Sequence, residues 1–187
     1  MIYPKKINAK KSDVIIRSLI LASILLGIIF VLINKITTPN IPWAALTNSG
    51  IIYVWLIVIY SVKKRINIAG HSLLQLFAIS ILTLYIDYRI GFRGWSIEIS
   101  IPIIIMIANI VMFILTIISY KKYIKYGFCQ LIIVLFSMLP LIFIVNNSLK
   151  NEVLSIIAVS ISIINLIFAL IFASTDIKEA VVRRFHI

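Results

Sequence analysis

Four charged side chains lie within twelve residues near the middle of the chain, between two long apolar runs. Two acids, Asp87 and Glu98, enclose two arginines, Arg89 and Arg93, and Trp95 stands among them. Exposed ion pairs of this kind stabilise a turn by only about 0–1 kcal/mol each, whereas a guanidinium also binds phosphate through paired hydrogen bonds. The segment predicts either a self-paired cap on a helical hairpin, which we favour, or a site for a lipid phosphate or another anion.

Neutral polar side chains interrupt three of the apolar runs. Thr47, Asn48 and Ser49 lie together in one run, and Asn109 and Asn165 lie near the centres of two others. An amide in hydrocarbon needs a partner, and hydrogen bonds between membrane helices contribute roughly 0.6–2 kcal/mol. We therefore expect helix–helix contacts at these residues. The alternative is a solute path, in which such residues line a cavity or an interrupted helix.

Catalytic patterns are missing from the sequence. It has no Gly-rich phosphate loop, no His-Glu-x-x-His metal helix and no Gly-x-Ser-x-Gly nucleophile turn. Cys129 is the only cysteine, and His71 and His186 are the only histidines, so neither a cysteine zinc set nor a histidine triad is available. Ser96 is the one hydroxyl in the charged segment and has no base beside it. We expect no enzymatic activity, no cofactor and no metal.

The composition is that of a membrane protein. Of the residues, 62% are hydrophobic and 13% are charged, and the mean hydropathy is +1.13; a soluble domain has about twice that share of charge. A helix needs roughly 20 apolar residues to cross the bilayer. We predict an all-α polytopic membrane protein with a bundle of six transmembrane helices, and a kink in the fifth at Pro140. The six predicted spans are Ser18–Asn34, Trp43–Val62, Ser72–Ile86, Ile99–Ser119, Gly127–Val145 and Val153–Ser174.

Basic residues set the predicted orientation. The net charge is +12, from 18 basic and 6 acidic residues. Of the basic residues, 14 fall on one side of the predicted bundle and 4 on the other. Since loops on the cytoplasmic side are enriched in Lys and Arg, we predict a multi-pass protein of the cell membrane with both termini in the cytoplasm. The inner side then carries most of the basic residues, among them Lys63, Lys64, Arg65, Lys121, Lys122, Arg183 and Arg184.

This topology divides the chain into a basic segment over 1–17, a transmembrane domain over 18–174 and a basic tail over 175–187. We expect the tail to continue from Asp176 to His186 as a short helix on the inner membrane surface, with Glu179 and Arg183 spaced i, i+4. The expected partners are a bilayer with anionic head groups and a membrane protein or a second copy of the chain. Nucleic acid is not expected, because the topology already accounts for the positive charge. Non-catalytic binding of a partner or lipid is the favoured function, and a small transporter or channel is the alternative.

Several short segments carry a resemblance to a known family. They are Tyr3-Pro4, the helix around Trp55, Asp87 with Gly91 and Gly94-Trp95-Ser96, Pro102, and the ending Arg183-Arg184-Phe185-His186-Ile187. On these residues the chain resembles an uncharacterised family, a domain of unknown function found in small multi-helix membrane proteins of Gram-positive bacteria. Longer members look as if they carry a cysteine zinc ribbon ahead of the Tyr-Pro, and this sequence lacks those cysteines. The resemblance implies a fold class but no activity.

Overall fold

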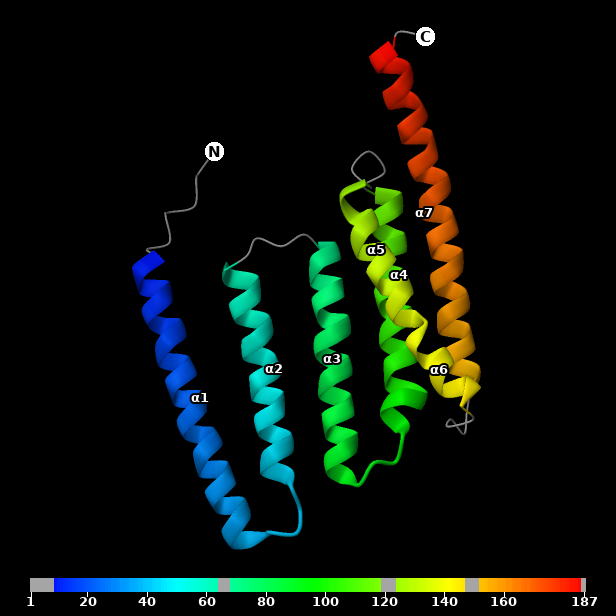
Figure 1. Ribbon diagram of the computed structural model, residues 1–187. Coiled ribbons are helices and arrows are strands. Elements are labelled where there is room, and N and C mark those ends of the chain that lie inside the picture. Colours follow the sequence, from blue (N-terminus) through cyan, green and yellow to red (C-terminus); the bar gives the residue numbers. More distant parts are fainter. Residues whose placement is uncertain (1–8, 64–67, 119–123, 147–151, 186–187) are drawn as a thin grey trace. The chain divides into compact units, whose positions relative to one another are not determined.

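The computed structural model describes the backbone of residues 9–63, 68–118, 124–146 and 152–185, and the side chains of 14–61, 68–118, 127–146 and 152–171. Within these residues six helices are long and apolar enough to cross a membrane. The chain divides into two compact units, residues 1–59 and 60–187. The first is a helical hairpin and the second is a helical bundle, and both are coloured along the chain in Figure 1.

The hairpin consists of α1 (Ala9–Thr37) and α2 (Trp43–Lys63). Asn34, in the last turn of α1, closes the connection between them. Its Nδ2 donates to the carbonyl oxygens of Thr38 at 2.6 Å and Ile41 at 2.8 Å, and its Oδ1 accepts from Ala44 N at 3.1 Å. The Phe30 and Trp43 rings pack beside it with centroids 6.0 Å apart. One amide therefore satisfies backbone groups that the helix ends leave without a partner.

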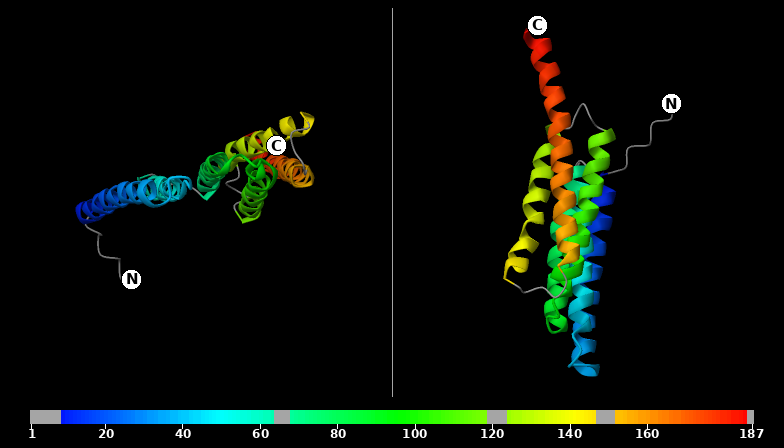
Figure 2. Two further views of the ribbon diagram at one scale, coloured as in Figure 1. Left: turned by 90° about the horizontal axis from the view of Figure 1, so that it is seen from below. Right: turned by 90° about the vertical axis from the view of Figure 1, so that its right-hand side faces the viewer.

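The bundle contains α3 (Ile68–Ile90), a π-helical turn η1 (Ser96–Ser100), α4 (Ile101–Ile118), α5 (Ile124–Ser137), α6 (Leu139–Val145) and α7 (Val153–Phe185). Helix α4 packs against α3, α5 and α7, and Figure 2 shows these helices gathered together when seen end on. Half of the central span, Ser96–Ile118, is buried. The buried core includes Leu76, Ile105, Ala108, Met112, Ile133 and Ala158.

Two proline residues explain where the bundle helices lose regular α geometry. Pro102 has no N–H to donate to the carbonyl four residues back, and the preceding turn is wound as a π-helix, in which Ile101 N donates to Ser96 O. Pro140 likewise lacks an N–H to donate, and the fifth span, Gly127–Val145, is divided at Met138 into α5 and α6. The predicted kink beside Pro140 is present: α5 ends at Ser137, and α6 leaves its direction in Figure 1.

The predicted spans agree with the structure in number and differ at their ends. Helix α3 starts four residues before the predicted Ser72 and ends four residues after Ile86, so Asp87 lies inside the helix. Glu98 lies in η1, ahead of α4. The predicted spans stopped at the charged residues Asp87 and Glu98. Hydropathy alone does not show that a polar side chain can find hydrogen-bond partners within the last turn of a helix.

The C-terminal tail is helical, as predicted, but it is not a separate helix. Helix α7 runs without interruption from Val153 to Phe185, and Figure 1 shows it continuing in one direction beyond the other helices of the bundle. At about 1.5 Å per residue, a helix of 33 residues is longer than the hydrocarbon layer. The backbone of the tail therefore extends the last span along its own axis. The side chains of Glu179 and Arg183 lie outside the described residues.

Candidate functional site

The turn between α3 and α4 begins with a regular helix ending. Gly91 N donates to Tyr88 O at 3.3 Å, and Phe92 N donates to Asp87 O at 2.8 Å. This pair of bonds is the Schellman motif, which requires a left-handed residue just past the helix end. Gly91 supplies it with φ +105°. Phe92 is also left-handed, at φ +43°, which is uncommon for a residue with a side chain. The turn is therefore held in one conformation by more than its glycines.

The Asp87 carboxylate supplies that additional restraint. It is fully buried, and its Oδ1 accepts a hydrogen bond from Arg93 N at 2.9 Å. Its Oδ2 accepts from Ser96 Oγ at 2.8 Å and from Ser96 N at 3.3 Å. Three donors thus converge on one carboxylate. Because these donors lie in the turn and at the first residue of η1, Asp87 ties the end of α3 to the start of the next helix, where a negative charge is favoured by the helix dipole.

The sequence predicted Arg89 and Arg93 against Asp87 and Glu98, and the structure shows other donors at Asp87. Arg89 and Arg93 are exposed, and Arg93 reaches Asp87 through its backbone N–H and not through its guanidinium. The physical reason is burial: backbone N–H groups and a serine hydroxyl can surround a buried carboxylate without being desolvated as a second charge would be. Trp95 is half-buried ahead of η1. Asp87 therefore caps the turn through backbone and hydroxyl donors, and Arg89 and Arg93 are exposed.

A second polar centre lies inside the bundle, where α4, α5 and α7 meet. Asn109 Nδ2 donates to Ser162 Oγ at 2.7 Å and to Ile105 O at 2.9 Å. Asn165 Nδ2 donates to Asn109 O at 2.9 Å and to Asn109 Oδ1 at 3.2 Å. Gln130 Nε2 lies 3.4 Å from the same Oδ1. We call these four side chains, Asn109, Gln130, Ser162 and Asn165, the amide cluster.

The amide cluster joins three helices through one hub residue. Asn109 is fully buried and bonds to partners on α5 and α7, so the interhelical contact expected of Asn109 and Asn165 is present between them. Two acceptor atoms, Gln130 Oε1 and Asn165 Oδ1, are buried and accept no hydrogen bond from the described residues. A buried acceptor left in this state costs about 1–3 kcal/mol. The cluster is therefore well connected but not fully satisfied.

The polar patch of α2 does not interrupt its helix. Thr47 Oγ1 and Ser49 Oγ donate to carbonyl oxygens of α2 itself, those of Trp43 and Leu46. Asn48 faces α1 and donates to Gly27 O at 3.2 Å. A Cβ atom on Gly27 would lie 2.8 Å from Asn48 Oδ1, so the glycine is what allows the amide to approach α1. The patch provides one contact across the hairpin.

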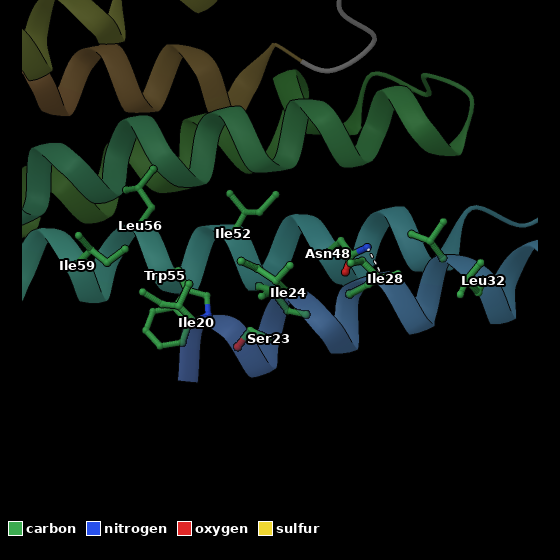
Figure 3. A pocket seen from close by; sticks show the side chains of 13 residues that line it. Ile20, Ser23, Ile24, Ile28, Leu32, Asn48, Ile52, Trp55, Leu56 and Ile59 are labelled. Carbon is green, nitrogen blue, oxygen red and sulfur yellow. Dashed lines mark hydrogen bonds between the residues drawn. The ribbon is translucent and has the colours of Figure 1, made fainter. Parts of the chain in front are cut away.

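Beside this contact lies an apolar groove between α1 and α2. Its volume is about 670 Å³, and Figure 3 shows isoleucine side chains of both helices along it, with Trp55 near one end and Asn48 towards the other. We call it the hairpin groove; it is lined by Ile20, Ser23, Ile24, Gly27, Ile28, Val31, Leu32, Asn48, Ile51, Ile52, Trp55, Leu56 and Ile59. Every lining residue belongs to the hairpin unit, so the groove is complete within it.

Smaller pockets lie in the described part of the bundle. One, of about 270 Å³, lies between α3 and α4 and includes His71, Ser72 and Gln75 in its lining, so the i, i+4 pair His71 and Gln75 does share one face. Another, of about 360 Å³, is apolar and lies beside Pro140. Among the described residues, no three His, Cys, Asp or Glu side chains come together as a metal site.

Most of the basic residues predicted for the inner surface have side chains outside the part of the chain that the structure describes. Helix α2 ends at Lys63, whose side chain is not described, and Lys64, Arg65, Lys121 and Lys122 lie outside the described residues. Arg183 and Arg184 belong to the backbone of α7, but their side chains are likewise not described.

In the described residues, six helices long and apolar enough to cross a membrane, with polar side chains bonded within and between them, define a polytopic α-helical membrane protein. A family model described as "Family of unknown function (DUF6320)" matches residues 3–187, and the chain belongs to that family. No curated protein and no solved structure matches it. The resemblance seen in the sequence is therefore confirmed at the level of an uncharacterised family.

Sequence reasoning missed Asn34, Gln130 and Ser162 as structural polar residues, and gave Ser96 no partner. Each had a visible signal. Asn34 and Asp87 are both polar residues at the end of an apolar run, and Gln130 is an amide within one. Ser162 stands three residues before Asn165, which places both on one helix face. The spacing of Ser162 and Asn165 was thus a signal that both could face one partner.

Proposed function

We propose that this protein is a non-catalytic integral membrane protein that binds an anionic lipid in the hairpin groove. The observation that carries the proposal is the groove itself. Its volume of about 670 Å³ falls within the range of roughly 300–1,000 Å³ in which proteins hold small molecules. A groove of this size between two membrane helices suits a lipid acyl chain better than a third helix, which needs a longer face.

The polarity of the groove supports the same ligand. Its polar members direct their donors to the backbone: Ser23 Oγ donates to Leu19 O at 2.8 Å, and Asn48 Nδ2 donates to Gly27 O. The remaining lining is apolar, mainly isoleucine and leucine. A ligand in the groove therefore meets hydrocarbon along most of its length, which favours an acyl chain over a polar solute.

Arg17 supports a negatively charged head group. It is exposed and lies one helical turn before Ile20, at the end of the groove where Trp55 and Ile59 lie. Residues spaced i, i+3 share a helix face, so the guanidinium is placed close to where a chain would leave the groove. A guanidinium suits phosphate through its paired donors, and a basic side chain near an anionic membrane surface contributes about 1 kcal/mol.

The proposed location is the cell membrane, with both termini in the cytoplasm, on the strength of the basic residues in alternate connections. Arg17 then lies at the cytoplasmic leaflet, where anionic lipids are enriched. Reporter fusions at Asn67 and Tyr126 should read cytoplasmic, and fusions at Asn40 and Phe92 should read external. A cytoplasmic signal at Phe92 would contradict this orientation.

Native mass spectrometry of the protein released from nanodiscs of phosphatidylglycerol and phosphatidylcholine tests the lipid proposal. We expect the wild type to retain phosphatidylglycerol, Ile24→Trp to lose it because the indole fills the groove, and Arg17→Gln to lose the preference between the two lipids. The matched control is Ile29→Trp, at an exposed position of α1 outside the groove lining. Equal retention in all four proteins would overturn the proposal, and a retained protein partner in place of lipid would favour a protein interface.

A small transporter or channel is the second candidate, favoured by the interrupted fifth span and the unpartnered acceptors of the amide cluster. Transporters commonly bind solutes near interrupted helices. Asn109 and Asn165, however, bond to each other, and Thr47 and Ser49 bond to their own helix. Polar groups that are already hydrogen-bonded to the protein are less suited to line an open solute path. Uptake of water or neutral solutes into proteoliposomes at the rate of protein-free vesicles would exclude this candidate.

A further inference from the structure

The amide cluster has only one possible arrangement of donors and acceptors. Asn109 Nδ2 lies 2.9 Å from Ile105 O, and Asn165 Nδ2 lies 2.9 Å from Asn109 O. Both contacts are made to backbone carbonyl oxygens, which accept hydrogen bonds and never donate them. Turning either amide over would place two acceptors against each other. The backbone therefore fixes the orientation of both asparagines.

The orientation of Gln130 follows from that of Asn109. With Asn109 Nδ2 committed to Ile105 O and Ser162 Oγ, its Oδ1 is the atom that faces Gln130. An acceptor requires a donor opposite it, so Gln130 presents Nε2 and its Oε1 points elsewhere. Gln130 Oε1 and Asn165 Oδ1 are the atoms that accept nothing from the described residues. Both unsatisfied atoms of the cluster are acceptors, so both need a hydrogen-bond donor.

We propose that the amide cluster is a binding site for a neutral hydrogen-bond donor, held by Gln130 Oε1 and Asn165 Oδ1, with water as its smallest ligand. Gln130 and Asn165 donate to the same acceptor, Asn109 Oδ1, so both residues belong to the same three-helix junction. Gln130 is fully buried, and 4% of Asn165 is exposed.

The site selects against a cation because it lacks a counter-charge. The cluster consists of three amides and one serine. The spans Gly127–Val145 and Val153–Ile171 contain no Asp or Glu, and the one acid in the span Ser96–Ile118 is Glu98, in the turn η1 at its start. Asp87 is already surrounded by donors. A bare ion brought to mid-membrane depth without an opposite charge is strongly disfavoured. A water molecule, or a solute that presents O–H or N–H, meets the same two oxygens without that cost.

A structure of the wild type in lipid nanodiscs, at a resolution that shows ordered water, tests the proposal directly. We expect density about 2.7–3.2 Å from Gln130 Oε1, from Asn165 Oδ1 or from both. The variant Gln130→Met, similar in shape, should lose the density at position 130, whereas Gln130→Glu should keep it because a protonated carboxyl retains the acceptor oxygen. Asn165→Leu serves as a second removal variant if Gln130→Met does not fold.

Thermal unfolding in sodium chloride and in N-methylglucamine chloride separates the neutral ligand from an ion. The neutral donor predicts the same midpoint in both salts for the wild type, for Gln130→Met and for the control Thr116→Val, whose hydroxyl donates to its own helix at Met112 O. A sodium-dependent midpoint that Gln130→Met abolishes would overturn the proposal in favour of a cation. Density showing both oxygens in contact only with carbon atoms would overturn it outright.

Discussion

The hairpin and the bundle close their first turns with the same device but fill their interiors differently. Asn34 and Asp87 each lie in the last turn of a helix and bond to the turn and to the start of the next helix. Away from the turn, the described part of the hairpin has a polar contact from Asn48 to Gly27 and an open groove. The bundle has the amide cluster and a continuous core.

This difference is reflected in burial. In each of the two hairpin spans 6% of the apolar stretch is buried, compared with 50% of the corresponding stretch in the central span of the bundle. The apolar character does not explain it, because Val14–Thr37 is nearly as hydropathic as Ser96–Ile118, 2.7 against 2.8. Since lipid is as apolar as leucine, association of membrane helices depends on small residues and interhelical hydrogen bonds. The bundle has both along α4 and α7; the hairpin has one glycine and one asparagine at its contact.

The largest expected effect is the loss of the Asp87 cap. Asp87→Asn replaces one acceptor oxygen with an NH2 group that faces N–H or O–H donors, and hydrogen bonds to a charged group contribute about 1.5–3 kcal/mol. We expect the bundle to lose roughly 3 kcal/mol of unfolding free energy, measured by reversible unfolding in mixed micelles. Exchanging Asp87 and Arg89 should be equally damaging, since the acid is buried and the arginine is exposed. A stable exchanged protein would contradict the cap described here.

Removing the hub of the amide cluster should come second. Asn109→Leu leaves Ser162, Gln130 and Asn165 without their shared partner, and interhelical bonds of this type contribute about 0.6–2 kcal/mol each. We expect a loss of about 2 kcal/mol in the same unfolding assay, and a double-mutant cycle with Asn165→Leu should be non-additive. The control is Thr116→Val, which removes a buried hydroxyl bonded only to its own helix. Additive effects in the cycle would mean that the two asparagines do not act as one unit.

The hairpin should respond to a single methyl group. In Gly27→Ala the new Cβ lies 2.8 Å from Asn48 Oδ1, so the amide must move and its bond to α1 is strained or lost. A cost of about 1 kcal/mol and a wider α1–α2 distance by spin-label spectroscopy are expected. Gly50→Ala is the matched control on α2, because nothing lies within 4 Å of its added Cβ. It should stabilise the helix by up to about 1 kcal/mol. Identical distances in the two variants would remove Gly27 from the contact.

The smallest effect is expected at the exposed arginines. Arg89→Ala and Arg93→Ala should each change the unfolding free energy by less than about 0.5 kcal/mol, as is usual for surface substitutions, since neither guanidinium bonds to Asp87. The same unfolding assay measures this. A loss comparable with that of Asp87→Asn would restore the ion-paired turn predicted from the sequence.

Much of the fold was visible in the sequence. Six apolar runs predicted six spans, Pro140 predicted the break in the fifth, and the glycines after Asp87 predicted a turn. These features are local: span length follows from bilayer thickness, and a missing N–H breaks a helix wherever it occurs. The exact helix ends were less visible, because Asp87 and Arg89 belong to α3 despite their charge.

The partner of each polar group was decided only by the tertiary structure. The sequence offered Asp87 two arginines, but three backbone and hydroxyl donors surround it because a buried acid is satisfied more cheaply by dipoles than by a second desolvated charge. It also offered Asn109 and Asn165 with no indication that Gln130 joins them. In lipid, burying one apolar face of a helix instead of another changes the free energy little, because lipid is as apolar as the helix face. Its rotation is therefore set by the few polar and small residues that meet across helices, and those meetings exist only once the helices are packed.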